Sequence, residues 1–206
     1  MNVRLTEEQK IKILNSDDLY KIMQQILLRQ NKIRRSQEYF WAVGLDDQNT
    51  VLFVELISIG RSNRVYVSPP DVFRMGVYKL SKKMILVHNH PSGGIEPSEK
   101  DKEFTNKLLK AGKIIEIDVI DHFIITEKEY FSFADAGLIK KFEIDNLLQL
   151  IDQEKNEIKA LKVEVEKEKA KKEEALKIAK RLKSLDVDIK TIKESTGLDE
   201  SELEAI

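Results

Sequence analysis

The chain has no cysteine, and this absence removes several kinds of site at once. Without cysteine there is no disulfide framework, no thiolate ligand for zinc and no thiol nucleophile. Long apolar runs are also missing, because no stretch approaches the roughly 20 residues that cross a bilayer. The N-terminal segment carries too many charges for a secretory signal peptide. We therefore expect a soluble, cytoplasmic protein with no membrane partner.

Neither sign of charge dominates, since 35 Lys and Arg residues face 36 Asp and Glu residues. A formal net charge of −1 gives no whole-chain argument for binding nucleic acid or an anionic membrane. Hydrophobic residues make up 41% of the 206 residues, which suffices for a core. Charged residues make up 34%, above the usual quarter. Part of the chain should therefore be strongly solvated.

The charged residues concentrate toward the C-terminus. Between residues 154 and 183, 18 of 30 residues are charged, 11 of them basic, and none is Gly, Pro or aromatic. Apolar residues at spacings of four and three favour a long amphipathic helix or a short, imperfect coiled coil from about Leu147 to Leu182. Two short helical signals around Ser195 are faintly similar to part of a helix-turn-helix. We predict three parts: helical segment 1–35, globular domain 36–142 and charged helical tail 143–206.

The globular part alternates strand and helix patterns. Predicted strands, rich in β-branched and aromatic residues, are 39–45, 50–57, 65–67, 83–87, 114–120 and 122–126. Helical patterns cover 6–30, with capping signals at Thr6 and Ser16, then 69–80 and 99–110, the last ended by Gly112. Strands that alternate with helices predict an α/β or α+β class, with a mixed sheet covered by helices.

The chemical signal gathers in the segment LVHNHPSGGIEPSEKD. His88 and His90 lie two residues apart at the end of an apolar strand, so both imidazoles can face one point. Ser98 is the expected N-cap of the next helix, which places Asp101 in its first turn, near the positive end of the helix. Two imidazoles and one carboxylate form a three-ligand zinc set that leaves a fourth position for water.

A zinc-bound water has a pKa of about 7, and a base must still take its proton and return it to the leaving group. Glu55 is the candidate, because an unpaired carboxylate inside the otherwise apolar run VLFVELI would be costly. Beside a cation that cost falls, and we predict that Glu55 exchanges a proton near neutral pH. Each residue also has a purely structural interpretation. Asp101 can cap its helix, the two histidines can form hydrogen bonds with the turn, and Glu55 can face solvent on an edge strand. The combination favours the metal site.

The spacing His88-x-His90, seven residues, Ser98, two residues, Asp101 resembles the signature of the JAMM/MPN metalloproteins, with Glu55 at the position of their catalytic glutamate. ELISIG, HNHPSG, PSEKD and GKIIEIDVIDHFII are similar to the RadC-like branch, over about residues 36–135. The resemblance implies an MPN fold, a curved mixed sheet flanked by helices, with zinc held by the two histidines, Asp101 and a water. It also implies Glu55 as general acid/base and Ser98 as the group that holds the water or the oxyanion.

Three functions follow as hypotheses. The resemblance implies a zinc hydrolase acting on an amide, peptide or isopeptide bond. The RadC-like branch also carries a "DNA repair" label, so a nucleic-acid accessory protein using the basic tail is a second hypothesis. Longer RadC proteins begin with a glycine-rich helix-hairpin-helix, which we expect to be missing because residues 1–35 contain no glycine. The third is a scaffold that self-associates through the long helix. His122 is interpreted as structural, or at most as a support for a ligand.

Overall fold

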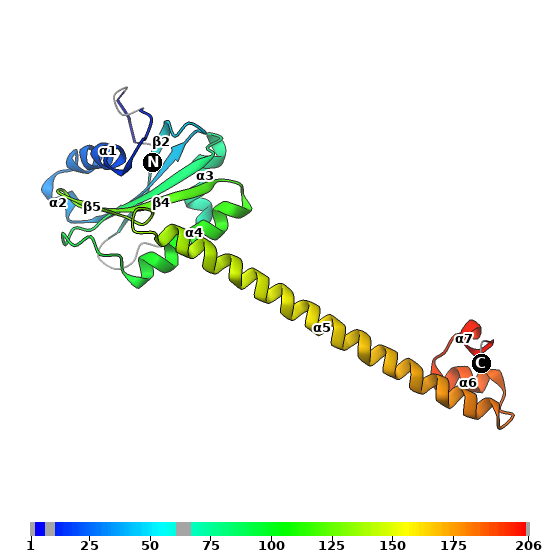
Figure 1. Ribbon diagram of the computed structural model, residues 1–206. Helices are drawn as coiled ribbons and strands as arrows, with labels where there is room; N and C mark the ends of the chain where they lie inside the picture. Colours follow the sequence, from blue (N-terminus) through cyan, green and yellow to red (C-terminus); the bar gives the residue numbers. More distant parts are fainter. Residues whose placement is uncertain (1–2, 7–10, 61–66, 205–206) are drawn as a thin grey trace. The chain divides into compact units, whose positions relative to one another are not determined.

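A five-stranded mixed sheet forms the core of the N-terminal part of the chain, in a computed structural model that describes residues 3–6, 11–60 and 67–204 (Figure 1). Its strands are β1 (Glu38–Leu45), β2 (Val51–Gly60), β3 (Lys83–Asn89), β4 (Asp118–Ile125) and β5 (Tyr130–Ser132). The spatial order is β2-β1-β3-β4-β5. β3 and β4 are parallel, and the other neighbouring strands are antiparallel. This architecture confirms the predicted mixed sheet with flanking helices.

Helices cover both faces of the sheet (Figure 1). α1 (Ser16–Leu28) lies on one face, after which the single turn α2 (Lys32–Arg35) leads into β1. α3 (Pro69–Tyr78) and α4 (Glu99–Ile114) lie on the other face. α4 links β3 to β4, as the crossover between parallel strands requires.

Side chains point alternately to the two faces of the sheet along each strand, so each face has its own hydrophobic core. Trp41 and Val43 of β1 face α1 and pack with its buried Met23. Phe40 and Ala42 face the opposite side and pack in the core that includes α3 and α4. The pairing of β1 with β2 shifts register at two points, and such bulges bend a strand and increase its twist. The candidate site lies on the α3 and α4 side of this bent sheet.

The first helix is shorter than predicted. α1 begins at Ser16, and its N-cap is Asn15, whose side chain accepts a hydrogen bond from the amide of Asp18. The prediction of a helix from Thr6 onward is wrong for residues 11–14, because Lys12 forms a β-bridge with Thr50 instead. The part of this prediction on residues 7–10 lies outside the described residues. Pairing with the sheet satisfies the backbone here in place of a helical turn.

Two further boundaries differ from prediction. α4 passes Gly112 and ends at Ile114, and the two strands predicted over 114–126 are the single strand β4. Glu116 has a φ of 58°, which turns the chain between helix and strand. The short strand β5 was not predicted. Of the strand predicted at 65–67, residues 65 and 66 lie outside the described residues, and Val67 is buried without being part of a strand.

The C-terminal region is helical, as predicted. α5 (Leu138–Lys183), α6 (Ile189–Thr196) and α7 (Glu200–Glu204) follow the sheet. Contacts divide the chain into two compact units, Met1–Asn146 and Leu147–Ile206. The second unit has its own small core of Ala179, Ile192, Leu198 and Leu203. Within the described residues, no helix combines the length and the apolar character needed to cross a membrane.

Candidate metal centre

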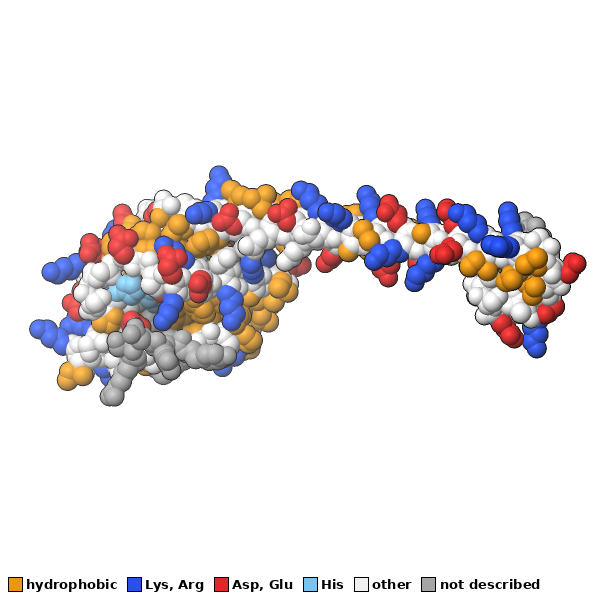
Figure 2. Space-filling model, turned by 90° about the horizontal axis from the view of Figure 1, so that it is seen from below, with side chains coloured by type: hydrophobic (Ala, Val, Ile, Leu, Met, Phe, Trp, Pro, Cys, Tyr) orange, Lys and Arg blue, Asp and Glu red, His pale blue; other side chains and the backbone are white. Residues whose placement is uncertain are grey.

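The two predicted histidine ligands meet where β3 ends. β3 runs through His88, and His90 follows it, held by a hydrogen bond from its backbone N–H to the carbonyl of Ile125. The Nε2 atoms of His88 and His90 are 3.0 Å apart. His88 is 8% exposed, and histidine side chains reach the surface on the face of the molecule shown in Figure 2. The alternation of the strand therefore brings both imidazoles to one point, as predicted.

The N-terminus of α4 brings in the third predicted ligand. Ser98 is the N-cap of α4 and forms a reciprocal capping box with Asp101, the residue three positions later. Asp101 Oδ2 accepts hydrogen bonds from the Ser98 amide at 2.8 Å and from its hydroxyl at 2.6 Å. Asp101 Oδ1 lies 3.4 Å from His88 Nε2, and Oδ2 lies 3.8 Å from His90 Nε2. The cap therefore holds the carboxylate against both imidazoles.

This donor set fits a divalent metal. One ligand atom from each of His88, His90 and Asp101 lies within 4.8 Å of the others. Ligands at zinc distances of about 2.0–2.1 Å in a tetrahedron lie about 3.3 Å apart. The two imidazole nitrogens are 3.0 Å apart, and each has a carboxylate oxygen of Asp101 nearby, Oδ1 at 3.4 Å from His88 and Oδ2 at 3.8 Å from His90. Nitrogen and oxygen donors also suit other divalent metals, so the residues define a metal site without naming the ion.

A chain of hydrogen bonds fixes which nitrogen of His88 carries its proton. The Thr105 hydroxyl donates to the backbone carbonyl of Asp101 at 2.5 Å, so its oxygen is left to accept from His122 Nδ1 at 2.6 Å. His122 Nε2 then has a lone pair and accepts from His88 Nδ1 at 2.8 Å. The remaining nitrogen of His88, Nε2, therefore presents its lone pair to the metal site.

A single hydrogen bond sets the tautomer of His90. Its Nδ1 lies 2.8 Å from the carbonyl oxygen of Gly94, which can only accept, so a neutral ring carries its proton on Nδ1. Nε2 of His90 then presents a second lone pair toward His88 and Asp101. Three acceptors converge, and a bound cation would satisfy all of them.

Burial favours neutral imidazoles at this site. Burial, offset only in part by the Asp101 carboxylate, lowers the pKa of His88 to about 4. Burial also lowers the pKa of His122 well below its usual value, with His88 and His90 acting in the same direction. Neutral imidazole is the form that binds a metal, so these shifts keep the ligand ready at neutral pH.

A buried acid, Asp121, supports the middle of β4 beside His122. Asp121 accepts hydrogen bonds from the Ser132 hydroxyl and from the backbone amides of Ala134 and His122. Burial raises the pKa of Asp121 to about 6 in spite of these donors. Asp121 thus ties β4 to the turn after β5 and holds the backbone of His122.

Glu55 lies on the same face of the sheet as His88. It pairs with Ala42 of β1, whereas His88 pairs with Phe40, two residues away on the same strand. Strand spacing and rise place the two Cα atoms about 12 Å apart, with β1 between them. Glu55 is only 1% exposed, so the alternative of an acid facing solvent is wrong.

Arg74 of α3 donates a hydrogen bond to Glu55 Oε1 at 2.7 Å. The side chain of Arg74 is 70% exposed, while that of Glu55 is 2% exposed. Sequence reasoning missed this residue, because a solvated arginine on an amphipathic helix gives no local signal. Thr105 was also missed, although it lies four residues after Asp101 and therefore on the same side of α4.

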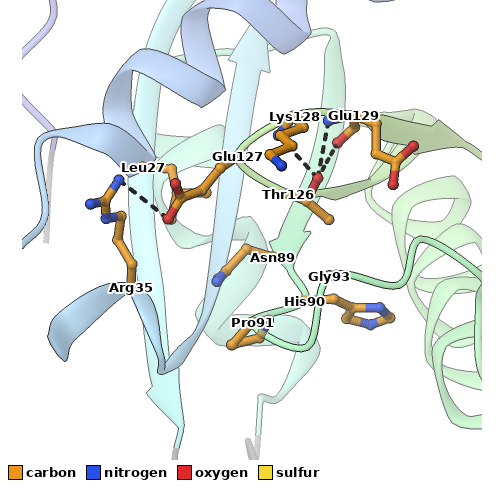
Figure 3. Close-up of a pocket in the computed structure, with 10 residues that line it drawn as sticks. All are labelled: Leu27, Arg35, Asn89, His90, Pro91, Gly93, Thr126, Glu127, Lys128 and Glu129. Carbon is orange, nitrogen blue, oxygen red and sulfur yellow. Dashed lines mark hydrogen bonds and ion pairs between the residues drawn. The ribbon is translucent and has the colours of Figure 1, made fainter. Parts of the chain in front are cut away.

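A cavity of about 410 Å³ adjoins the metal site, on the other side of the β3 end. Figure 3 shows the His90 ring turned away from Asn89 and Pro91, which also line this cavity. Arg35 and Glu127, 3.2 Å apart, form an ion pair in its lining. Asn89 accepts a hydrogen bond from the Tyr39 amide and donates one to the Gln37 carbonyl, so it ties the end of β3 to the start of β1.

Comparisons with known proteins agree with this geometry. The RadC-like JAB domain matches residues 13–138. A UPF0758 protein of Methanosarcina mazei is 40% identical over 134 residues, which are 65% of this chain and 56% of the relative. A UPF0758 protein of Desulforamulus reducens is 45% identical over 103 residues, which are 50% of this chain and 45% of the relative.

A UPF0758 protein of Flavobacterium johnsoniae is 38% identical over 127 residues, which are 62% of this chain and 53% of the relative. The chain thus spans about half the length of the curated relatives that it matches. The domain match covers more than half of this chain and includes the whole candidate metal site. The chain therefore belongs to the family of RadC-like JAB domain proteins.

Proposed function

We propose that this protein is a zinc-dependent hydrolase of the JAMM type, which cleaves an amide, peptide or isopeptide bond. The observation that carries the proposal is the convergence of two imidazole lone pairs and a carboxylate, with the tautomer of each histidine set by its other nitrogen. Zinc, when bound, supplies Lewis acidity and lowers the pKa of a water molecule to about 7. The family and the buried acid Glu55 on the same face give further support.

In this proposal each residue has one task. His88, His90 and Asp101 hold the metal, and Glu55 takes a proton from the attacking water and returns it to the leaving amine. The ion pair with Arg74 holds the carboxylate of Glu55 in place. Ser98 positions Asp101 through the capping box. Its implied role at the water or the oxyanion requires its hydroxyl to turn from Asp101, and it stays a prediction.

The cavity beside His90 is the proposed place for part of the substrate. Its volume of about 410 Å³ lies within the range of small-molecule pockets, about 300–1,000 Å³. Its lining carries charges of both signs, Arg35 and Lys128 beside Glu127 and Glu129, which suits the polar groups of a peptide. A peptide that enters this cavity would pass the loop that carries His90.

The test uses the purified full chain beside Glu55→Gln and His88→Ala. Metal analysis should find one zinc per chain in the wild type and in Glu55→Gln, and little in His88→Ala. Cleavage of peptide and isopeptide libraries should fall at least about 100-fold in both variants, since general acid/base catalysis contributes about 10²–10⁴-fold. Unchanged cleavage in both variants would contradict the mechanism, and absence of bound zinc in carefully prepared wild type would contradict the cofactor.

Nucleic-acid binding by the helical tail is a second proposal, supported by the 11 basic residues between 154 and 183. These residues are interleaved with 7 acidic ones, and the sequence of α7, ESELE, is itself acidic. The discriminating measurement is the salt dependence of binding to a DNA duplex. Phosphate contacts predict an affinity that falls steeply between 50 and 200 mM salt, and a flat response excludes this binding mode.

A further inference from the structure

α5 carries an apolar stripe that its own chain does not cover. The stripe consists of Leu147, Ile151, Ile158, Leu161 and Val165, whose exposed fractions lie between 37% and 60%. Every residue from 147 to 174 is exposed. Hydrophobic side chains recur among the charged ones on the helix in Figure 2. A helix of this length gains most of its stability from burying one face, so the stripe requires a partner.

The continuation of the stripe shows that this face of α5 is built for burial. At the same spacing along α5 come Ala175, Ala179 and Leu182, which pack against the buried Ile192 of α6 and Leu198. Ala179 is only 1% exposed. Lys172, at the junction, pairs with Glu202 of α7. The same face of α5 is therefore covered by α6 and α7 near its C-terminal end and is exposed to solvent from residue 147 to about residue 168.

The residue types on the open part match a two-stranded coiled coil. In heptads abcdefg, Ile151, Ile158 and Val165 occupy successive a positions, and Leu147 and Leu161 occupy d positions. β-branched residues at a with leucine at d favour parallel dimers. Glu154 and Glu168 occupy the other two d positions and weaken the interface. This pattern predicts a short dimeric coiled coil of limited affinity.

The charges beside the stripe favour a second copy of the chain in parallel orientation as the partner. In a parallel dimer each g residue faces the e residue five positions later in the partner helix. The g residues Glu157 and Glu164 would then face the e residues Lys162 and Lys169, which gives opposite charges at both places. An antiparallel pair would bring glutamate to glutamate and lysine to lysine. The charges therefore favour one partner and one orientation.

We propose that residues 147–168 of α5 form a parallel, in-register coiled coil with the same segment of a second chain. The coil ends where α6 and α7 occupy the stripe of their own helix. The first heptad adds two exposed apolar residues, Leu148 and Leu150, at the flanking e and g positions. This self-association is independent of the metal and of the proposed hydrolase activity.

Sedimentation equilibrium of the full chain over a wide concentration range tests the dimer. Ile158→Lys places a charge at the centre of the interface and should weaken dimerisation at least 100-fold. Glu154→Leu should tighten it at least about tenfold, because it replaces two facing carboxylates. Val163→Lys is the matched control, since Val163 occupies an outward f position and is 44% exposed, and it should leave the dimer unchanged. A wild type that stays monomeric at every concentration, or a dimer insensitive to Ile158→Lys, overturns the proposal.

A charge exchange tests the contact between the two copies. Glu157→Lys alone and Lys162→Glu alone each create like charges across the dimer and should weaken it about fivefold or more. The double exchange should restore the wild-type affinity to within about twofold. If the double variant loses as much affinity as the two single variants together, the proposed pairing is rejected. Circular dichroism and zinc content, expected to be unchanged in all variants, separate this result from misfolding.

The orientation has its own test, because the chain contains no cysteine. Ile151→Cys places one thiol at an a position, and in a parallel, in-register dimer the two thiols face each other. Mild oxidation should convert most of the dimer to a disulfide-linked species. A dimer that forms no such link has a different register or orientation, and this outcome rejects the proposal.

Discussion

At the scale of single residues, the candidate metal centre depends on where a few protons lie. The Thr105 hydroxyl donates to the Asp101 carbonyl, and this sets the tautomer of His122 and, through it, that of His88. One threonine on α4 therefore decides whether a lone pair of His88 points at the metal. Residues that support ligands in this way typically change metal affinity 10- to 100-fold when they are replaced.

Replacing Thr105 should test this chain of hydrogen bonds directly. Thr105→Val keeps the shape but removes the hydroxyl, so His122 loses its acceptor and zinc affinity should fall about tenfold or more. Thr105→Ser retains the hydroxyl and should bind zinc within about threefold of the wild type. Competition with a coloured chelator measures both affinities. Equal affinities for Thr105→Val and the wild type would show that the hydrogen-bond chain does not control the ligand.

The buried titratable groups predict how the stability of the metal-free protein depends on pH. Burial lowers the pKa values of His88 and His122, so each contributes stability above about pH 6.5 that decreases as the pH falls below it, for His88 toward a pKa of about 4. The pKa of Asp121 is raised to about 6, so its contribution runs the other way and falls as the pH rises from about 4 to 6. With two imidazoles against one carboxyl, the free energy of unfolding should rise with pH across this window.

Urea denaturation of the metal-free protein at pH 4.5, 5.5 and 6.5 measures this dependence. The variant Asp121→Asn removes the opposing carboxyl, so the total rise in unfolding free energy from pH 4.5 to 6.5 should become larger by about 2 kcal/mol. A slope that is unchanged or reduced in Asp121→Asn would show that the carboxyl does not titrate as its burial implies.

At the scale of elements, α4 serves the site at its N-terminus and the core at its C-terminus. The capping box of Ser98 and Asp101 starts the helix and orients a metal ligand with the same hydrogen bonds. At the other end, Gly112 lies inside the helix and not after it. A Cβ built there would lie 2.5 Å from the backbone oxygen of Ile117, so glycine permits a close contact between helix and chain.

Gly112→Ala should therefore destabilise the protein, although alanine is the better helix former. The helical gain of about 1 kcal/mol is outweighed by a contact with backbone that cannot move aside cheaply, and we expect a net loss of about 1–3 kcal/mol. Gly94→Ala is the matched control, because a Cβ there meets nothing within 4 Å. Thermal unfolding compares the two, and equal melting temperatures would contradict the close contact.

At the scale of the whole molecule, the metal site lies in the first compact unit, and the second unit has a small core of its own. The first unit, Met1–Asn146, contains all three candidate ligands and Glu55. It also contains the hydrogen bonds that link Thr105 through His122 to His88. α6, α7 and the end of α5 have a core of their own in Leu147–Ile206. The first unit has the larger core, with helices on both faces of the sheet.

A chain that ends after Asn146 should fold and bind zinc with the affinity of the full protein, because it keeps every ligand and both large cores. It should also be monomeric, because it lacks the stripe of α5. Calorimetric titration with zinc and light scattering measure both properties. A large loss of zinc affinity in this shortened chain would mean that the second unit supports the metal site.

Local patterns account for what the sequence alone predicted. The two histidines were found because strand residues two apart share a side, and Asp101 because a cap three residues earlier fixes it in the first helical turn. The ligand types therefore indicated a metal site, and the spacing indicated the family. The apolar stripe of α5 was visible for the same reason, since heptad spacing is a property of neighbours in the chain.

Tertiary structure decided what depends on contacts between distant segments. Thr105 and His122 are 17 residues apart, and Glu55 and Arg74 are 19 residues apart, so no local pattern could link them. The same holds for Gly112, whose tight contact exists only because the chain turns back at Glu116. The order of residues alone indicated which side chains can bind a metal. The fold determined where their protons lie, because hydrogen-bond partners are chosen by proximity in space.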